Sequence, residues 1–281
     1  MAYKTILVHL KLGAANDTLL KITGELAQRF RSRIIGVVVS QPLPELYPAM
    51  QTAYGNGLTG EDISDTDRKV TDRRIHEAEQ EFRTALRGYD LEWRSTVTKN
   101  SRSEYVARQC RSADLLITSP VYDGRFVDQS QKLSIGDIVL HAGRPVLLIP
   151  PDTEHLDLDC AVVGWKDTRE ARRAAADSLP LLAFAKRVVV AEITARQDIA
   201  DSKRHVEEVV GWLRAHDVAA EARIESYKGV ESGQLDFIAR ECGAGLFVAG
   251  AYGHTRFREW VIGGVTMDLL LHPKRPTLVS H

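Results

Sequence analysis

The sequence predicts an α/β protein made of two tandem open, doubly wound parallel-sheet domains of the Rossmann-like kind. Its central apolar runs, such as Ile34–Val39 and Leu246–Ala249, are continuous rather than alternating. Strands have such continuous apolar sequences when helices cover both faces of a parallel sheet. Amphipathic segments such as Asp17–Phe30 separate these runs. Strands and helices therefore alternate along the chain, as in open α/β sheets.

An internal repeat divides the chain into two copies. Ile6–Lys11 is similar to Ala161–Lys166, and Arg144–Leu147 is similar to Arg275–Leu278. Such self-similarity indicates two structural units of one kind. The polar, proline-marked segment Pro150–His155 separates them. We therefore expect domains over residues 1–152 and 157–281, each close to the common domain size.

Each copy is expected to follow the same order of elements. In the first copy, strands are expected at Thr5–Leu10, Arg33–Val39, Glu92–Thr98, Leu115–Thr118 and Pro145–Ile149, with helices at Asp17–Phe30, Asp65–Leu86, Arg102–Cys110 and Ser134–His141. In the second copy, strands are expected at Ala161–Trp165, Arg187–Ile193, Ala220–Tyr227, Leu246–Ala249 and Thr277–Ser280, with helices at Glu170–Phe184, Ser202–His216, Gln234–Glu241 and Thr266–Leu271.

The first copy is longer than the second between these equivalent motifs. The excess falls at about residues 41–68, where prolines and glycines gather, including Pro42, Pro48, Gly55 and Gly57. Proline and glycine interrupt regular structure. We therefore expect an inserted loop at this position.

Composition excludes several classes of function. The 281 residues are 44% hydrophobic and 27% charged, with a net charge of −1. A phosphate-backbone binder normally carries a basic excess, so no nucleic-acid partner is expected. No apolar run reaches the roughly 20 residues that span a bilayer, so no membrane association is expected. Met1–Thr5 enters a strand without the shape of a signal peptide, and three cysteines make no disulfide framework, so we expect a cytoplasmic protein.

A glycine motif follows the apolar run Leu246–Ala249. Gly250 and Gly253 come first, and Gly263 and Gly264 follow after nine further residues. Glycines let the backbone approach a phosphate, and the N–H groups of the loop and the next helix end point at the charge. The motif therefore predicts a polyphosphate site at the end of a buried strand. The alternative is that these glycines only permit tight turns.

The pattern G-x-x-G, nine residues, G resembles the nucleotide-binding signature of the universal stress protein family. Arg275–Ser280 is similar to the closing strand of that family, and Val162–Ala171 resembles its first strand and turn. The resemblance covers nearly the whole chain in two copies. It implies a protein of stress response or signalling that binds an adenine nucleotide (ATP, ADP or AMP, with or without Mg²⁺) in the second domain.

The resemblance also implies which residues hold the nucleotide. They are Gly164, Trp165, Lys166, Asp167, Ile193, Gly250, Gly253, His254, Gly263, Gly264, Val265 and Thr266. The main chain of Ile193 matches a position that meets the adenine. Gly264 stands where nucleotide-binding members have Ser or Thr, while Thr266 supplies a hydroxyl two residues later. His254 is expected either to touch a phosphate or to face solvent.

Lys166 departs from the family pattern, which has an aspartate at the end of the first strand. Lysine has only donors and cannot accept a hydrogen bond from adenine or ribose. Asp167 could take that part if the turn is rotated by one residue, or Lys166 could reach a phosphate. A lysine that is merely solvated is the third alternative.

The first copy is expected to have lost phosphate binding. The strand Leu115–Thr118 is followed by Pro120, Tyr122 and Asp123, without G-x-x-G, and only Gly136 remains of the later glycines. Proline removes a backbone donor, and an aspartate repels phosphate. The first domain is therefore expected to pair with the second within the chain through the closing strands. A homodimer of chains rests on the resemblance alone.

No catalytic constellation stands out in the sequence. Cys110 and Cys242 precede equivalent strands and are expected to be small buried residues, and His9 is expected to be a core histidine. Trp165 and Trp260 are expected to pack rather than stack on a ligand. No metal-ligand spacing or activated nucleophile is visible. Three functions stay open: a nucleotide-binding module with at most slow ATP hydrolysis, an interaction module without nucleotide, and an ATP-using enzyme that only the fold would support.

Overall fold

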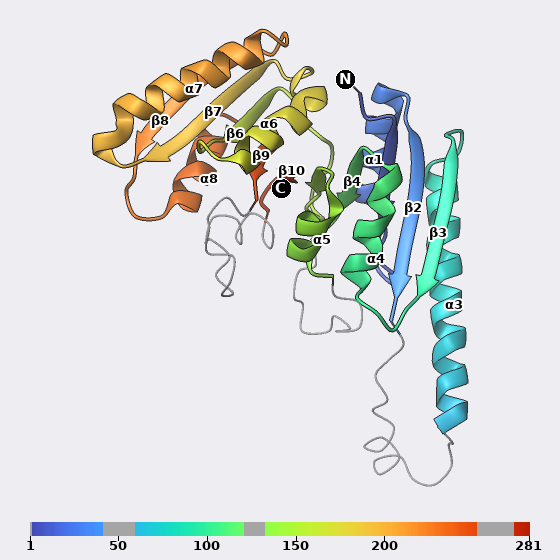
Figure 1. Cartoon of the computed structure of the whole chain (residues 1–281). Coiled ribbons are helices and arrows are strands. Elements are labelled where there is room, and N and C mark those ends of the chain that lie inside the picture. The colour runs from blue at the N-terminus through green and yellow to red at the C-terminus, as the bar shows by residue number, and fades with distance from the viewer. Residues whose placement is uncertain (1, 42–59, 121–132, 252–272) are drawn as a thin grey trace.

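Ten strands form one sheet flanked by helices in the computed structural model (Figure 1). The structure describes residues 2–41, 60–120, 133–251 and 273–281, and only the backbone of 60–67. The strand order is β3-β2-β1-β4-β5-β10-β9-β6-β7-β8. The first half of the chain supplies five neighbouring strands and the second half the other five. The predicted α/β class is confirmed.

The element bounds match most of the predicted ones within a few residues. The strands are β1 (Thr5–His9), β2 (Arg33–Ser40), β3 (Leu91–Val97), β4 (Leu115–Thr118), β5 (Val146–Leu148), β6 (Cys160–Gly164), β7 (Arg187–Thr194), β8 (Ala220–Ser226), β9 (Leu246–Gly250) and β10 (Thr277–Ser280). The helices are α1 (Asp17–Phe30), α3 (Gly60–Ala85), α4 (Arg102–Gln109), α5 (Ile135–Ala142), α6 (Arg169–Leu182), α7 (Ile199–Arg214) and α8 (Glu231–Glu241). The helix expected at Thr266–Leu271 lies outside the described residues.

The pairing of β5 with β10 joins the two halves. Eight of the nine strand pairs are parallel, and β5 and β10 are antiparallel through the pairs Thr277↔Leu148, Leu278↔Leu147 and Val279↔Val146. Each of these strands would otherwise end its half with an unpaired edge. The antiparallel seam relates the two strand orders, 3-2-1-4-5 and 8-7-6-9-10, by an approximate two-fold axis.

Two apolar layers cover the sheet, one on each face. Along β7, Val188 and Val190 belong to the layer that includes buried side chains of α1, α3, α6 and α7. Val189 and Ala191 belong to the layer that includes those of α4, α5 and α8. Because both faces are buried, most residues of the central strands are apolar, which explains the continuous runs.

The insertion in the first half is helical in part, which corrects the expectation of a loop over residues 41–68. Helix α3 begins at Gly60 rather than near Asp65 and has 26 residues, against 16 in its counterpart α7. After Gly60 the segment contains no proline or glycine that would stop a helix. The first turns of α3 project past the carboxyl ends of β2 and β3 (Figure 1).

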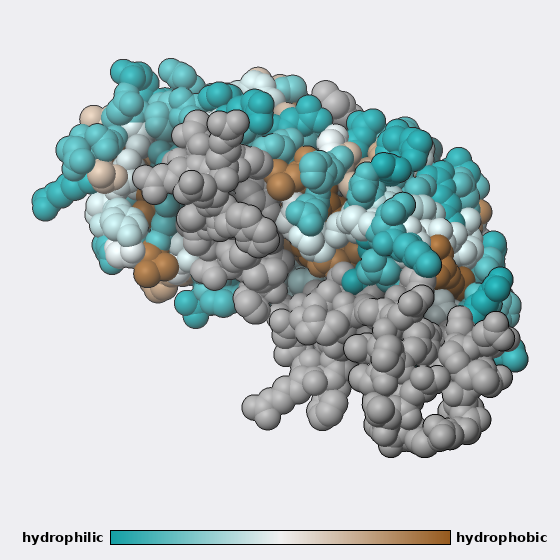
Figure 2. Space-filling view, turned by 60° about the horizontal axis from the view of Figure 1, so that its bottom comes forward, coloured by the Kyte–Doolittle hydropathy of each residue, from teal (hydrophilic) through white to brown (hydrophobic). Residues whose placement is uncertain are grey.

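On the face shown in Figure 2, hydrophilic side chains cover much of the described part, and apolar ones appear in separate patches. Of the large exposed apolar side chains among the described residues, Val97 lies in the first half, and the others, which include Phe184 and Phe237, lie in the second. Among the described residues, no helix combines the length and apolarity that a membrane crossing requires.

Candidate nucleotide site at the ends of β6, β7 and β9

Three of the predicted site residues lie together at the carboxyl edge of the sheet. Gly164 ends β6, Gly250 ends β9 and Ile193 is next to the last residue of β7. Gly164 pairs with Ala191 of β7 and Ala249 of β9. The strand order of the second half reverses between β6 and β9, and open α/β sheets bind ligands at such a reversal. Gly253, His254, Gly263, Gly264, Val265 and Thr266 lie outside the described residues.

Close packing explains the two glycines at the strand ends. A Cβ on Gly250 would lie 2.5 Å from the backbone nitrogen of Ala171 and 2.5 Å from the carbonyl carbon of Glu170, in the first turn of α6. A Cβ on Gly164 would lie 2.9 Å from the ring of Phe247. Gly250 therefore requires glycine for packing alone, whereas a side chain at Gly164 would need the Phe247 ring to shift.

The turn from β6 to α6 carries Lys166 and Asp167, whose side chains are both exposed. Asp167 pairs with Arg172 at 2.5 Å, so its carboxylate already has a cationic partner. Thr168 caps α6, because its hydroxyl oxygen accepts from the backbone N–H of Ala171 at 3.3 Å. Lys166 projects into solvent beside the helix N-terminus. An acceptor role for Asp167 would compete with its ion pair to Arg172.

The equivalent lysine of the first half is placed differently. The Lys11 ammonium donates to the carbonyl oxygen of Pro120 at 2.8 Å and to the Ser119 hydroxyl at 3.4 Å. It thus links the carboxyl ends of β1 and β4, where the strand order of the first half reverses. Burial lowers the pKa of Lys11. A side chain of the protein therefore occupies the crevice of the first half.

Two solved structures have the same arrangement over nearly their full length. One is a universal stress protein from Archaeoglobus fulgidus DSM 4304, with 15% identity and a TM-score of 0.69; the match covers 99% of this chain and 98% of that one. The other, from Pseudomonas aeruginosa UCBPP-PA14, is assigned provisionally to the universal stress proteins; it has 16% identity and a TM-score of 0.63, with 99% and 93% covered.

The chain has the universal stress protein fold. The resemblance seen in the sequence is thus confirmed at the level of architecture. No protein-family model and no curated protein matches the sequence.

A buried polar network lies next to this site in the second half of the universal stress protein fold. The indole N–H of Trp165 donates to Nδ1 of His205 at 3.3 Å, and His205 Nε2 lies 3.5 Å from Oε2 of Glu192. Trp165 is buried, as expected of a packing residue. Sequence reasoning missed Glu192 and His205. The available signal was Glu192 itself, a carboxylate inside the apolar run of β7.

His9 and Cys110 are buried, whereas Cys242 is half-buried. His9 is buried and its Nδ1 lies 3.1 Å from the Thr118 hydroxyl, which confirms a core histidine. Burial, with Lys11 and Arg102 nearby, lowers the pKa of His9 to about 3. Cys110 is buried, and burial raises the pKa of its thiol to about 12. Cys242 corrects the expectation of a buried residue: it caps the end of α8, is half-buried and receives a contact from Arg223 at 3.9 Å.

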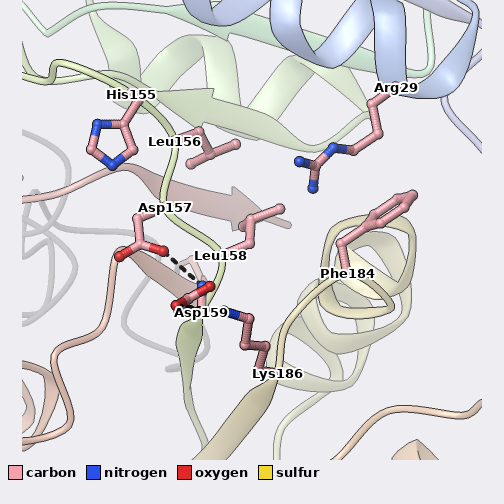
Figure 3. A pocket seen from close by; sticks show the side chains of 8 residues that line it. All are labelled: Arg29, His155, Leu156, Asp157, Leu158, Asp159, Phe184 and Lys186. Atoms are coloured by element: carbon pink, nitrogen blue, oxygen red, sulfur yellow. Dashed lines mark hydrogen bonds and ion pairs between the residues drawn. The ribbon is translucent and has the colours of Figure 1, made fainter.

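A pocket of about 740 Å³ lies on the opposite side of the sheet from the predicted site, at the amino ends of the strands (Figure 3). It is lined by Arg29 of α1, by residues 155–159 of the segment between the halves, and by Phe184 and Lys186. Asp159 and Lys186 directly precede β6 and β7, so the pocket borders the amino ends of these strands. Ligands of open α/β sheets bind at the carboxyl ends, and this pocket is therefore separate from the predicted site. No cluster of metal-ligating side chains occurs among the described residues.

Proposed function

We propose that this protein binds an adenine nucleotide, ATP in the first place, at the strand-order reversal between β6 and β9. We further propose that residues 1–152 and 157–281 are two domains and that the first serves as the permanent partner of the second. The observation that carries the proposal is the contrast between two equivalent lysines. Lys11 links the ends of β1 and β4, whereas Lys166 extends into solvent and, among the described residues, makes no such link between the ends of β6 and β9.

Each described residue at the strand ends would contact a different part of the nucleotide. The main chain of Ile193 would meet the adenine, while the backbone of Gly164 and Gly250, at the ends of β6 and β9, would face the ribose and phosphates. Lys166 would supply positive charge close to the amino end of α6, where the helix dipole also favours an anion. The loops that contain Gly253 and Gly263 would supply further N–H donors. Binding and signalling, rather than efficient turnover, is the proposed activity.

The first test is mass spectrometry of small molecules released when the purified protein is denatured. Titration calorimetry with ATP, ADP and adenosine then follows on wild type and two matched variants. Lys166→Ala should weaken ATP about tenfold, which corresponds to about 1.4 kcal/mol, and adenosine much less. Lys11→Ala should leave both affinities unchanged. Equal losses for ATP and adenosine would contradict a phosphate contact by Lys166.

Glycine substitutions test the loops predicted from the motif. Gly253→Val and Gly263→Val should each weaken ATP at least about tenfold, because a side chain would keep the backbone from the phosphates. Gly136→Val in the first half should not. Circular dichroism must show that each variant is folded. No binding at millimolar ATP, or two nucleotides per chain, would overturn a single site in the second half.

A second candidate function is an interaction module that binds no nucleotide. The charges at the start of α6 favour it. Glu170 carries a buried side chain in the first helical turn, its backbone packs against Gly250, and Asp167 lies before it in the turn. Two carboxylates close to a phosphate would repel it unless Arg169 and Arg172, their ion-pair partners, remain in place. Absence of both retained and added nucleotide would favour this function.

A further inference from the structure

A chain of three polar side chains connects the candidate site to helix α7. Trp165 directly follows β6, Glu192 lies on β7 and His205 lies on α7. Trp165 and Glu192 are 5% and 6% exposed, and the His205 side chain is 20% exposed. Polar groups this deeply buried are normally hydrogen-bonded, and they favour one arrangement of the chain.

The hydrogen-bond geometry fixes the tautomer of the neutral His205 imidazole. An indole N–H can only donate, so Nδ1 of His205 must be the acceptor at 3.3 Å. A neutral ring then carries its proton on Nε2, which faces Oε2 of Glu192 at 3.5 Å. That oxygen is buried and has no hydrogen-bond partner. The carboxyl group does receive a hydrogen bond from Ser202, one turn before His205 on α7.

The fold itself does not require this network. In the first half, Leu10 holds the position of Trp165 and Val38 that of Glu192, as the equivalent registers of β1 with β2 and β6 with β7 show. Both residues are buried and apolar. Among the described residues, the polar network therefore occurs in the second half alone, where Lys166 does not link the strand ends as Lys11 does in the first half. Burying this polar network costs more free energy than burying the apolar pair Leu10 and Val38. The extra cost favours a functional reason for the network.

Protonation of His205 would break the link to Trp165. A protonated imidazole has N–H groups on both nitrogens, so Nδ1 could no longer accept from the indole. The charged groups that face the network are Glu192 on β7 and Lys166 and Asp167 on the turn. Burial raises the pKa of Glu192, while His205, Ser202 and Lys166 lower it and Asp167 raises it. The network thus retains a proton more readily than an exposed carboxylate does.

Trp165 is anchored at two points just before the site. Its backbone N–H donates to the carbonyl oxygen of Ala191 at 2.8 Å, and its indole is held by His205. Lys166 follows immediately, and its carbonyl oxygen accepts from the N–H of Thr168 in a tight turn. Loss of the indole anchor would therefore be passed to the residues that face the ligand.

We propose that His205 and Glu192 are positioning residues that hold the turn from Trp165 to Asp167 in its ligand-binding arrangement only while His205 is neutral. This inference rests on the proposed nucleotide site in the second half. It adds a proton-dependent specificity element to that site, and it makes affinity fall as pH falls.

The test uses the full-length protein with indole ¹⁵N labelling. Trp165→Phe identifies the Trp165 indole signal, which should shift between about pH 8 and pH 5.5 in wild type. His205→Asn places an amide oxygen near the position of Nδ1 and cannot titrate, so its Trp165 signal should stay constant. His216→Asn, at the exposed end of the same helix region, is the matched control and should behave as wild type.

Calorimetry with ATP over the same pH range tests the positioning role. Wild type should bind about five- to tenfold more weakly at the acidic end, as expected for the loss of about one hydrogen bond. His205→Asn should keep the affinity that wild type has at pH 8 and show only the pH dependence of ATP itself. His205→Leu should be weak at every pH.

The outcomes separate this inference from the proposed function. A Trp165 signal that does not move in wild type, or moves equally in His205→Asn, overturns the network whether or not ATP binds. A moving signal with an affinity profile equal to that of His205→Asn overturns the positioning role. No ATP binding at any pH overturns the proposed function and the positioning role with it, while the indole titration still decides the network.

Discussion

His9 links the stability of the first half to pH. Its ring is enclosed in the sheet, and the pKa of about 3 in the folded state lies below the usual value near 6.5. The unfolded chain binds a proton more readily, so stability is lost as pH falls from about 6.5 towards 3. At about pH 4.5 this amounts to roughly 2–3 kcal/mol.

The His9→Asn variant should therefore lose less stability on acidification than wild type, although the substitution itself destabilises the strand at neutral pH. Urea unfolding at about pH 7.5 and pH 4.5 measures the difference in slope. His155→Asn, an exposed histidine between the halves, is the control and should keep the wild-type slope. Identical slopes for His9→Asn and wild type would contradict a neutral buried His9.

Glu192 produces the opposite dependence on pH. Burial raises the pKa of its carboxyl group, so the folded state holds the proton more tightly than the unfolded chain does. Stability from this group is fully present below the unfolded pKa and is lost as pH rises through the folded pKa. Glu192→Gln should therefore raise the melting temperature at about pH 8, where wild type buries a charge, and should gain little at about pH 4. Equal effects at both values would contradict a raised pKa.

At the scale of single elements, a substitution at Gly250 shows whether packing or ligand binding requires a glycine there. A Cβ there would meet the backbone of Glu170 and Ala171, which cannot move as a flexible side chain can. Gly250→Ala should therefore destabilise the protein by about 1–3 kcal/mol without any nucleotide present. Gly211→Ala is the matched control, because Gly211 is exposed in α7 with nothing within 4 Å of a new Cβ, and it should stabilise by up to about 1 kcal/mol.

Thermal unfolding of the ligand-free protein measures both changes. Wild-type stability in Gly250→Ala would mean that α6 does not approach β9 as closely as described. In that case a glycine at this position would be required by the ligand alone.

The elements themselves follow well from the sequence, because both faces of the central strands are buried and the repeat supplies each pattern twice. The start of α3 could not be predicted in this way, because its early residues lack an apolar stripe. Helix propensity alone favours a helix there. The strand-end residues Gly164, Ile193 and Gly250 could be predicted as neighbours, because carboxyl ends of parallel strands share one edge. The partnership of Trp165 with His205 could not, because the packing of α7 over β7 brings together residues 40 positions apart.

At the scale of the whole molecule, the seam between β5 and β10 makes one sheet of the two halves. Contacts across the halves accompany it: Tyr3 donates to the carbonyl oxygen of Asp177 at 2.5 Å, and the rings of Phe30 and Phe184 meet edge to face at 5.6 Å. Arg29 also lies over the Phe184 ring. A continuous sheet with such contacts favours cooperative unfolding of both halves.

Leu278→Ala tests this coupling, because Leu278 is fully buried on β10 opposite Leu147 of β5. The cavity should cost about 2–5 kcal/mol. Hydrogen exchange should then speed up in the strands of the first half, β1 and β4, as well as in β6 and β9, since loss of the seam exposes both halves. Val97→Ala, at the exposed end of edge strand β3, should change exchange only locally. Faster exchange confined to the second half in Leu278→Ala would show that the two halves unfold independently.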